Sequence, residues 1–356
     1  MIVVGINHKT APIEIREKFF LNSLEQDLLL SELKSSPSVI EAFVLSTCNR
    51  IEIYANVLEE KQQNHFAYFI KLISAVKKQE FVQNTARLFY CYTGKEALRH
   101  LLRVTAGLDS LVLGEKQILG QVKAAVERAR NRTMFTKTFN ILSNIAIRTG
   151  KKAQAETDIS FGGSSISWAA VIMAQGLLGD LRGKKFLIIG AGKMGEMAIS
   201  QIHSKGVSKI YLMNRTQETA EAMANKYQGI PAAFSDIKEI LTEVDVCVCS
   251  VGAPHYILEK STIQKVMALR NNQKLILLDI SMPRNIDPQV AAIENVYLSC
   301  IDDLENVVAE TMRKRQASLS AVEQIIEAKL NKFYEKLNKV QDPRLAFPTP
   351  QVGSKI

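Results

Sequence analysis

The sequence predicts an α/β protein of several domains: an N-terminal α+β domain, a doubly wound parallel domain and a long C-terminal connecting helix. Strand and helix patterns mix over residues 1–152 and alternate over 153–300, and one uninterrupted helical pattern covers 301–341. At 356 residues the chain is also too long for one core, because a domain usually takes roughly 100 to 200 residues. Residues 342–356 are expected to form a flexible tail.

Composition excludes several classes of protein. Hydrophobic residues make up 47% of the chain and charged residues 23%, which is typical of globular proteins and argues against disordered or fibrous structure. The longest apolar stretch, 166–178, is shorter than the roughly 18 residues that cross a bilayer. Residues 2–6 have strand character rather than that of an export signal, so we expect a cytoplasmic protein without a membrane segment.

The N-terminal domain contains both element types in no repeating order. Strand patterns cover 2–6, 41–45 and 51–57, and helical patterns cover 23–33, 62–78 and 94–104. The helical pattern continues over 116–150 and becomes basic: from Lys116 to Lys152 there are nine Lys or Arg residues and one acidic residue. The net charge of +9 permits a polyanionic partner, although a solvated basic helix is the simpler interpretation.

The second domain begins after a polar segment that ends in Gly162-Gly163-Ser164-Ser165, which is turn composition. A helix over 165–178 follows, and strand patterns then recur at 184–189, 209–213, 244–250, 274–280 and 296–298. Helical segments separate most of these strands, which indicates a doubly wound parallel sheet.

The C-terminal helix is amphipathic. Apolar residues recur at steps of three, four and occasionally seven from Leu304 to Val340, and neither Pro nor Gly occurs from Asp302 onward until Asp342-Pro343 ends the pattern. The apolar seam could pack against a partner helix.

A glycine motif gives the strongest local signal. Gly190-Ala191-Gly192-Lys193-Met194-Gly195 follows a predicted strand directly and begins a helix, as in the Rossmann dinucleotide-binding turn. A purely structural turn is the alternative. The next strand ends in Asn214-Arg215-Thr216, where NAD-binding sites usually carry an acidic residue; Arg215 and Thr216 suit the 2′-phosphate of NADP, unless Arg215 is only a solvated residue.

A second motif, Ser46-Thr47-Cys48-Asn49-Arg50, forms a short polar segment between two strand patterns. The neighbouring Arg50 can favour a thiolate, so Cys48 is either a nucleophile or a structural cysteine. The five cysteines are odd in number and contain no CxxC spacing, which argues against a disulfide framework or a zinc site, and we expect no metal. Cys247 and Cys249 alternate along a strand pattern and are expected to be core residues.

Two further segments carry candidate residues. His100 lies on a helical pattern, where a packing role is commoner than a catalytic one. Residues 107–121 contain three glycines and are expected to form a hinged loop entering a helix, able to bring Ser110, Glu115, Gln117 and Gln121 to a polar ligand. An ordinary connection between helices is the alternative.

Five segments together resemble the glutamyl-tRNA reductase family over residues 1 to about 340. They are Gly5-Ile6-Asn7-His8-Lys9-Thr10-Ala11-Pro12, residues 46–50, residues 107–123, the glycine motif 190–195 and Asp279-Ile280-Ser281-Met282-Pro283-Arg284. The resemblance implies reduction of tRNA-bound glutamate to glutamate-1-semialdehyde with NADPH, in the five-carbon route to tetrapyrroles.

The resemblance also implies roles for individual residues. Cys48 is expected to form a thioester with the glutamyl group, and His100 to be important for activity. The residues expected to line the glutamate pocket are Thr47, Cys48, Asn49, Arg50, Ser110, Glu115, Lys116, Gln117 and Gln121; Lys116 replaces the Pro or Thr common in the family. The residues expected to hold NADPH are Gly190, Ala191, Gly192, Lys193, Met194, Gly195, Asn214, Arg215 and Thr216.

The resemblance extends to partners: glutamyl-tRNA as substrate, transfer of the aldehyde to glutamate-1-semialdehyde aminotransferase, and a homodimer. The family's C-terminal dimerisation domain is expected to be largely missing, which leaves the long helix as the dimer contact. One alternative function is another NADP-dependent oxidoreductase, similar to shikimate dehydrogenase, which would not need Cys48. The other is a non-catalytic relative that binds glutamyl-tRNA, which would not need Cys48, His100 and the glycine motif together.

Overall fold

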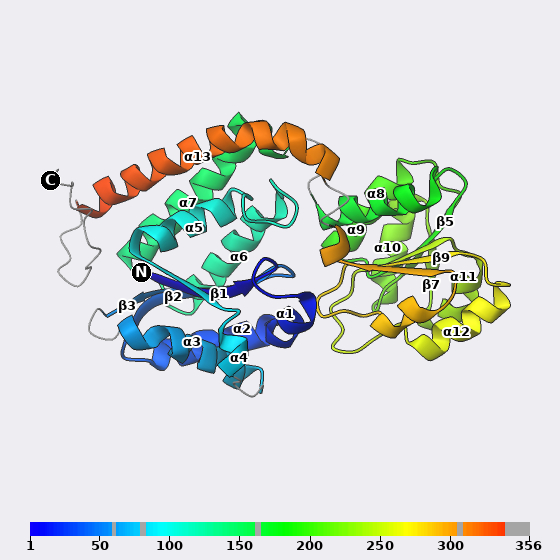
Figure 1. Ribbon diagram of the computed structural model, residues 1–356, viewed down its shortest axis with the longest axis horizontal. Coiled ribbons are helices and arrows are strands. Elements are labelled where there is room, and N and C mark those ends of the chain that lie inside the picture. Colours follow the sequence, from blue (N-terminus) through cyan, green and yellow to red (C-terminus); the bar gives the residue numbers. More distant parts are fainter. Residues whose placement is uncertain (59–61, 79–82, 161–164, 305–308, 339–356) are drawn as a thin grey trace. The chain divides into compact units, whose positions relative to one another are not determined.

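The computed structural model describes residues 1–58, 62–78, 83–160, 165–304 and 309–338 (Figure 1). The chain divides into two units: unit 1 contains Met1–Gly162 and Thr311–Ile356, and unit 2 contains Gly163–Glu310. The expected boundary at 152/153 is therefore ten residues too early, because helix α7 (Lys137–Glu156) continues through it. Residues 162–164 of the glycine-rich turn lie outside the described residues, and so does the expected tail.

Unit 1 is built on a four-stranded antiparallel sheet. Its order is β2 (Val39–Ser46), β3 (Arg50–Val57), β1 (Ile2–Asn7) and β4 (Tyr90–Thr93). β1 pairs with β3 so that Asn7 lies opposite Arg50. The first three strands are confirmed within two residues of the expected bounds. β4 was not expected from the sequence, because four residues are too few to establish a period.

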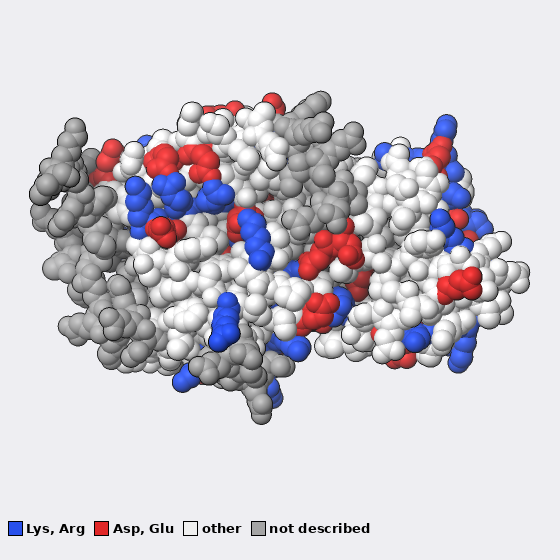
Figure 2. Space-filling view, viewed as in Figure 1, with Lys and Arg blue, Asp and Glu red and all other residues white. Residues whose placement is uncertain are grey.

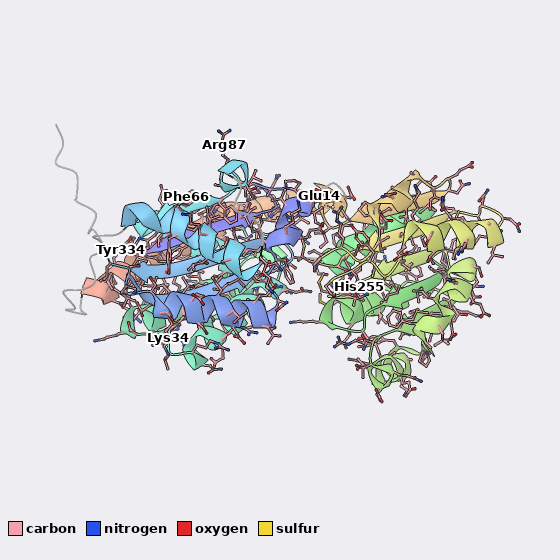
Figure 3. The ribbon with its side chains drawn as sticks, turned by 90° about the horizontal axis from the view of Figure 1, so that it is seen from below. Glu14, Lys34, Phe66, Arg87, His255 and Tyr334 are labelled. Carbon is pink, nitrogen blue, oxygen red and sulfur yellow. The ribbon has the colours of Figure 1, made fainter. Side chains whose placement is uncertain are left out.

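Helices cover both faces of this sheet. The helices are α1 (Ile13–Phe19), α2 (Ser23–Ser35), α3 (Gln62–Val76), α4 (Gln83–Ala86), α5 (Gly94–Thr105), α6 (Gln117–Asn131) and α7. α2 and α3 lie side by side across one face (Figure 3), and α5, α6 and α7 lie over the other (Figure 1). α2 begins with a capping box, in which Asn22 and Glu25 each bind the other's backbone N–H.

The long C-terminal helix, α13 (Ala309–Asn338), packs on unit 1. It begins later than expected, since Asp302–Leu304 form only a short turn. Its apolar residues Val322, Ile326, Leu330 and Phe333 are fully buried in the core of unit 1. The expectation that this seam is available to a partner chain is therefore wrong for this stretch: the helix's own unit covers it.

Unit 2 is a doubly wound parallel sheet, as the sequence predicts. Its order is β10 (Val296–Cys300), β9 (Leu275–Asp279), β8 (Val246–Cys249), β5 (Lys185–Ile189), β6 (Lys209–Met213) and β7 (Ile230–Ala232). The helices are α8 (Ile166–Leu178), α9 (Lys193–His203), α10 (Gln217–Tyr227), α11 (Ile237–Glu243) and α12 (Lys260–Leu269). The strand order reverses between β5 and β8, which is where such sheets bind ligands.

Two smaller findings complete the fold. The strand β7 was not expected from the sequence, because it has three residues and one of them is Pro231. Cys247 and Cys249 are fully buried in β8, as expected. Within the described ranges, no helix is both long and apolar enough to cross a membrane.

Candidate active site

Cys48 lies in a tight turn that joins β2 to β3. The Thr47 amide donates to the Arg50 carbonyl at 2.8 Å, and the Thr47 hydroxyl accepts from the amides of Asn49 and Arg50, each at 3.2 Å. The Cys48 carbonyl accepts from Nη1 of the buried Arg16 at 2.5 Å. Cys48 itself is half-buried. The turn is thus fixed on both sides, while part of Cys48 reaches the surface.

The thiol of Cys48 is not activated in the way the sequence suggests. The pKa of the Cys48 thiol is raised to about 12, chiefly by burial and then by the Glu115 carboxylate, whereas Arg16 and Arg50 act to lower it. Arg50 does act to lower the pKa of the thiol, as the sequence suggests, but burial of the thiol outweighs it. Two carboxylates also pair with Arg50 and oppose its charge.

Those carboxylates belong to Glu52 and Asp109, which were not predicted as site residues. Arg50 Nη1 donates to Glu52 Oε1 at 3.0 Å and to Asp109 Oδ2 at 2.9 Å. Burial alone would raise the pKa of Glu52, but Arg50 and His100 outweigh it and lower the pKa to about 2. Asp109 also pairs with Lys9. The result is a buried network of fixed charges beside the Cys48 turn.

His100 joins this network from α5. Its Nε2 lies 2.8 Å from Glu52 Oε1, and its ring packs among those of Tyr54, Tyr90 and Tyr92, with centroids 5.1 to 6.4 Å away. The hydroxyls of Tyr54 and Tyr90 also donate to Glu52. The structure therefore brings His100 and Arg50 to one carboxylate. Among the described residues, no hydrogen bond links His100 to Cys48.

Three buried polar atoms beside the Cys48 turn have no hydrogen-bond partner in the described part of the chain: His8 Nδ1, Asn49 Oδ1 and Arg50 Nε. The three residues come from two chain segments that lie next to each other, since the His8 amide donates to the Asn49 carbonyl at 3.0 Å. Burial and then Arg50 lower the pKa of His8 to about 4, so its imidazole is neutral near pH 7. Buried polar groups are seldom left unpaired, and these three are therefore suited to a polar ligand.

The loop before α6 supplies the remaining expected pocket residues. Its ends meet where the Gly114 amide donates to the Gly107 carbonyl at 2.9 Å, and a Cβ on Gly114, at φ 76°, would lie 1.8 Å from the Ile159 carbonyl oxygen. Ser110 and Glu115 are buried, and Lys116 is exposed. Burial raises the pKa of Glu115 to about 7, although Arg50 opposes the shift.

Gln117 and Gln121 are half-buried one turn apart on the same face of α6. The exposure of Lys116 separates it from the buried Ser110 and Glu115.

A cavity of about 370 Å³ lies over the charge network, on the side of His100 and Asp109. Its lining includes Asn7, Lys9, Tyr90 and Tyr92, but not Cys48. A larger groove of about 570 Å³ is lined by Glu32, His65 and Tyr68 among others, and it contains no expected site residue. The smaller cavity is therefore the one joined to the candidate site.

In unit 2 the glycine motif forms the turn between β5 and α9. Gly190 has φ 103°, and a Cβ there would lie 2.7 Å from the Ser250 carbonyl oxygen; a Cβ on Gly195 would lie 1.9 Å from the Gly190 carbonyl oxygen. A Cβ on Gly192 would meet no atom within 4 Å. Gly190 and Gly195 thus allow close packing. Gly192 leaves open space at the N-terminus of α9, which fits a dinucleotide's pyrophosphate.

The residues after β6 complete this second site. Asn214 Oδ1 accepts from the Ala191 amide at 3.2 Å and so connects the two turns. Arg215 and Thr216 are exposed, and no ion pair engages Arg215 in the described part of the chain. The Thr216 side chain makes no capping bond to α10. Both side chains are free to bind a phosphate. No group of three or more potential metal ligands occurs among the described residues.

The doubly wound sheet and the glycine turn of unit 2 are those of dinucleotide-dependent oxidoreductases. Residues 4–157 match the family model for the N-terminal domain of glutamyl-tRNA(Glu) reductase, and residues 172–307 match that for shikimate/quinate 5-dehydrogenase, so the dehydrogenase likeness concerns unit 2 alone. The chain belongs to the glutamyl-tRNA reductase family.

Relatives match nearly the whole chain. The glutamyl-tRNA reductase of Thermodesulfovibrio yellowstonii is 37% identical over 96% of this chain and 80% of its own length. That of Carboxydothermus hydrogenoformans is 40% identical over 94% of this chain and 74% of its own. The solved glutamyl-tRNA reductase of Methanopyrus kandleri is 32% identical, with a TM-score of 0.53 over 95% of this chain and 80% of that one.

Proposed function

We propose that the protein reduces the glutamyl group of glutamyl-tRNA to glutamate-1-semialdehyde and releases free tRNA, with NADPH as reductant, as the first step of 5-aminolevulinate synthesis by the five-carbon route. Family membership supports the substrate. The observation that carries the proposal for this chain is the Cys48 turn, which holds a half-buried thiol beside three buried polar atoms that lack partners.

The first chemical step is acyl transfer to Cys48. Its Sγ forms a bond to the glutamyl carbonyl carbon, the ester C–O bond to the terminal ribose breaks, and the thiol proton ends on the leaving ribose oxygen. Glu115 is suited to carry this proton, because a carboxyl with a pKa of about 7 exists in both states near neutral pH and its charge acts on the thiol. A nicotinamide nucleotide, when bound, would supply a hydride to the thioester carbonyl carbon. The C–S bond then breaks, the aldehyde leaves, and Cys48 recovers its thiol proton.

Other residues of unit 1 would orient the substrate. Arg50 has a buried Nε without a partner and can donate to a substrate carboxylate, while Glu52 and Asp109 hold its guanidinium in place. His100 contacts the same Glu52 oxygen as Arg50, Oε1, and is thus expected to act through the network. In unit 2, the open side of Gly192 and the exposed Arg215 and Thr216 would hold the pyrophosphate and the 2′-phosphate of NADPH.

The proposal includes direct transfer of the reactive aldehyde to glutamate-1-semialdehyde aminotransferase. It also includes a homodimer, but one whose contact is not the stretch of α13 from Val322 to Phe333, since those side chains are buried in unit 1.

Cys48→Ser tests the mechanism. We expect aldehyde release from glutamyl-tRNA and NADPH to fall by more than about a thousandfold, because a serine hydroxyl in this setting is a far weaker nucleophile. Without NADPH, the wild-type protein should slowly deacylate glutamyl-tRNA through hydrolysis of the thioester, and Cys48→Ser should not. Cys300→Ser is the matched control, because Cys300 is also half-buried but lies in unit 2. Aldehyde release by Cys48→Ser at the wild-type rate would contradict the proposal.

A further inference from the structure

A second polar groove lies in unit 1 between α7 and α13. It shares no lining residue with the Cys48 turn. Its volume is about 160 Å³. The side chains that line it are Ile141, Asn144, Ile145 and Arg148 of α7, and Lys329, Lys332 and Lys336 of α13. Four of these seven residues are cations, and none is acidic.

The cations converge because of helical spacing. Lys329, Lys332 and Lys336 are separated by three and four residues, so they share one face of α13. On α7, Asn144 and Arg148 are four residues apart and share the face that meets it. Arg148, Lys332 and Lys336 are exposed, and Lys329 is half-buried. The groove is therefore a partly enclosed hollow bordered by exposed positive charge.

These four cations lack acidic partners among the described residues, unlike other basic residues of unit 1. Arg128 and Arg132, from the basic stretch of the sequence, both pair with Asp27. Lys152, one turn beyond Arg148, pairs with Glu156. Arg148 is thus one of the cations of the basic stretch without an ion pair among the described residues, and the groove is where it meets the lysines of α13.

The other side of α13 shows the contrast within one helix. Glu327 and Glu323 pair with Arg99 and Arg103 of α5, and Figure 2 shows this band of opposite charges side by side. Charges on that side stabilise the packing of α13 on unit 1. The lysines on the groove side have no such role.

The groove's cations repel one another. Partial burial lowers the pKa of Lys329, and the nearby positive charges of Lys152, Lys332 and Arg148 lower it further, with only Glu156 opposing. The helix dipole favours Lys336, which lies in the last turn of α13, but it acts only within that turn and does not account for Lys329. An anion bound in the groove would relieve this repulsion.

We propose that the α7–α13 groove binds phosphate groups of the tRNA backbone, at a distance from the glutamyl group. This inference rests on the proposed function, which supplies an RNA substrate. From Lys329 to Lys336 the helix rises about 10 Å, which is long enough to follow successive phosphates of one strand. Exposed lysines along the border of the groove suit such an extended polyanion, whereas a small anion is usually held by buried donors.

The test is binding of uncharged tRNA(Glu), measured by fluorescence anisotropy over a series of salt concentrations. The test variant is Lys329→Gln/Lys332→Gln/Lys336→Gln. The slope of log affinity against log salt should fall by about three, one for each lost phosphate contact. In turnover assays the KM for glutamyl-tRNA should rise while kcat stays within about twofold, because Cys48 and its network are unchanged.

The control variant is Lys71→Gln/Lys238→Gln/Lys265→Gln. It removes the same net charge from exposed lysines on three separate helices, so it should leave the salt slope within about one of the wild-type value. Arg148→Gln alone should lower the slope by about one. A groove variant whose salt slope and KM match those of the control variant would overturn the proposal.

Two further outcomes distinguish an RNA site in the groove from a small-anion site and from the proposed function. Competition by inorganic phosphate that is lost in the groove variant, with tRNA binding unchanged, would assign the groove to a small anion and overturn the RNA site. If the wild-type protein showed neither turnover nor Cys48-dependent deacylation, the proposed function would fail. The salt slopes would still test whether the groove binds tRNA, because binding needs no catalysis.

Discussion

In unit 1 the candidate site is made of side-chain charges, whereas in unit 2 it is made of main chain. Arg50 and Glu52 are fully buried and depend on each other and on Asp109. The nucleotide turn of unit 2 depends instead on glycines that keep side chains away from the α9 N-terminus. A site that must hold a small charged acyl group needs fixed counter-charges, while a pyrophosphate can be bound by backbone amides alone. Substitutions should therefore act differently in the two units.

The largest expected effect is that of Glu52→Gln. It removes the carboxylate that joins Arg50, His100 and two tyrosine hydroxyls, and leaves the buried Arg50 with less compensation. We expect the free energy of unfolding of unit 1 to fall by about 3 to 5 kcal/mol. Urea unfolding followed by far-UV circular dichroism measures it, and the fluorescence of Trp168, the only tryptophan, follows unit 2.

Glu243→Gln is the matched control, because Glu243 pairs with Lys185 on the surface of unit 2, at 3.0 Å and with side chains about one third exposed. Its effect should be no more than about 1 kcal/mol. If Glu52→Gln and Glu243→Gln destabilised their units equally, the buried network would not be the basis of the unit 1 site.

The next effect is a pH dependence caused by Glu115. The pKa of its carboxyl rises from 4.5 to about 7 on folding, so between these values the folded chain holds a proton that the unfolded chain releases. Stability from this group is full below pH 4.5 and is lost as pH rises through 7, by up to about 3 kcal/mol. Glu115→Gln does not titrate, so its stability relative to wild type should increase from pH 4.5 to 8 in urea unfolding.

His8 has the opposite sign, since its pKa falls from 6.5 to about 4 and its contribution grows as pH rises between them. It is present in both the wild-type and the Glu115→Gln proteins, so it cancels in their difference. A difference that stays constant from pH 4.5 to 8 would show that the Glu115 carboxyl titrates normally.

The two units also differ in how far the sequence predicted them. In unit 2, the period of the strands and the spacing of three glycines predict fold and turn together, because the candidate site there is formed by main chain. In unit 1, Arg50, Glu52 and Tyr54 alternate along β3 and share one face, so the period of two could have indicated Glu52 and Tyr54 as neighbours of Arg50.

Other parts of the unit 1 site could not be predicted locally. Asp109 is 59 residues from Arg50, and only the tertiary fold brings them together. The same holds for the net effect on Cys48: the sequence shows the adjacent arginine, but not the burial or the distant Glu115 that raise its pKa. The seam of α13 was predicted correctly as apolar, but a sequence pattern does not say whether a helix packs on its own chain or on another.

In unit 2, a comparison of two glycines tests the role of the main chain. A Cβ on Gly195 would lie 1.9 Å from the Gly190 carbonyl oxygen, so Gly195→Ala should cost about 1 to 3 kcal/mol of stability, measured by urea unfolding with Trp168 fluorescence. Gly192→Ala places its Cβ in open space and should leave stability nearly unchanged, while its methyl group reduces NADPH affinity in a fluorescence titration. Equal stability losses in the two variants would mean that Gly195 and Gly192 do not have separate roles, one in packing and the other in ligand approach.

The smallest expected effect concerns Arg215, the side-chain charge proposed to bind the 2′-phosphate in unit 2. Arg215 is exposed at the end of β6, so Arg215→Gln should leave the stability of unit 2 unchanged. It should reduce the preference for NADPH over NADH about tenfold, because a charge-assisted contact to the 2′-phosphate contributes about 1.5 kcal/mol. The ratio of kcat/KM for the two cofactors measures it, with Lys238→Gln, an exposed cation of α11, as control. An unchanged ratio in Arg215→Gln would show that this side chain does not recognise the 2′-phosphate, and the contrast between a charge-built site in unit 1 and a main-chain site in unit 2 would then be sharper.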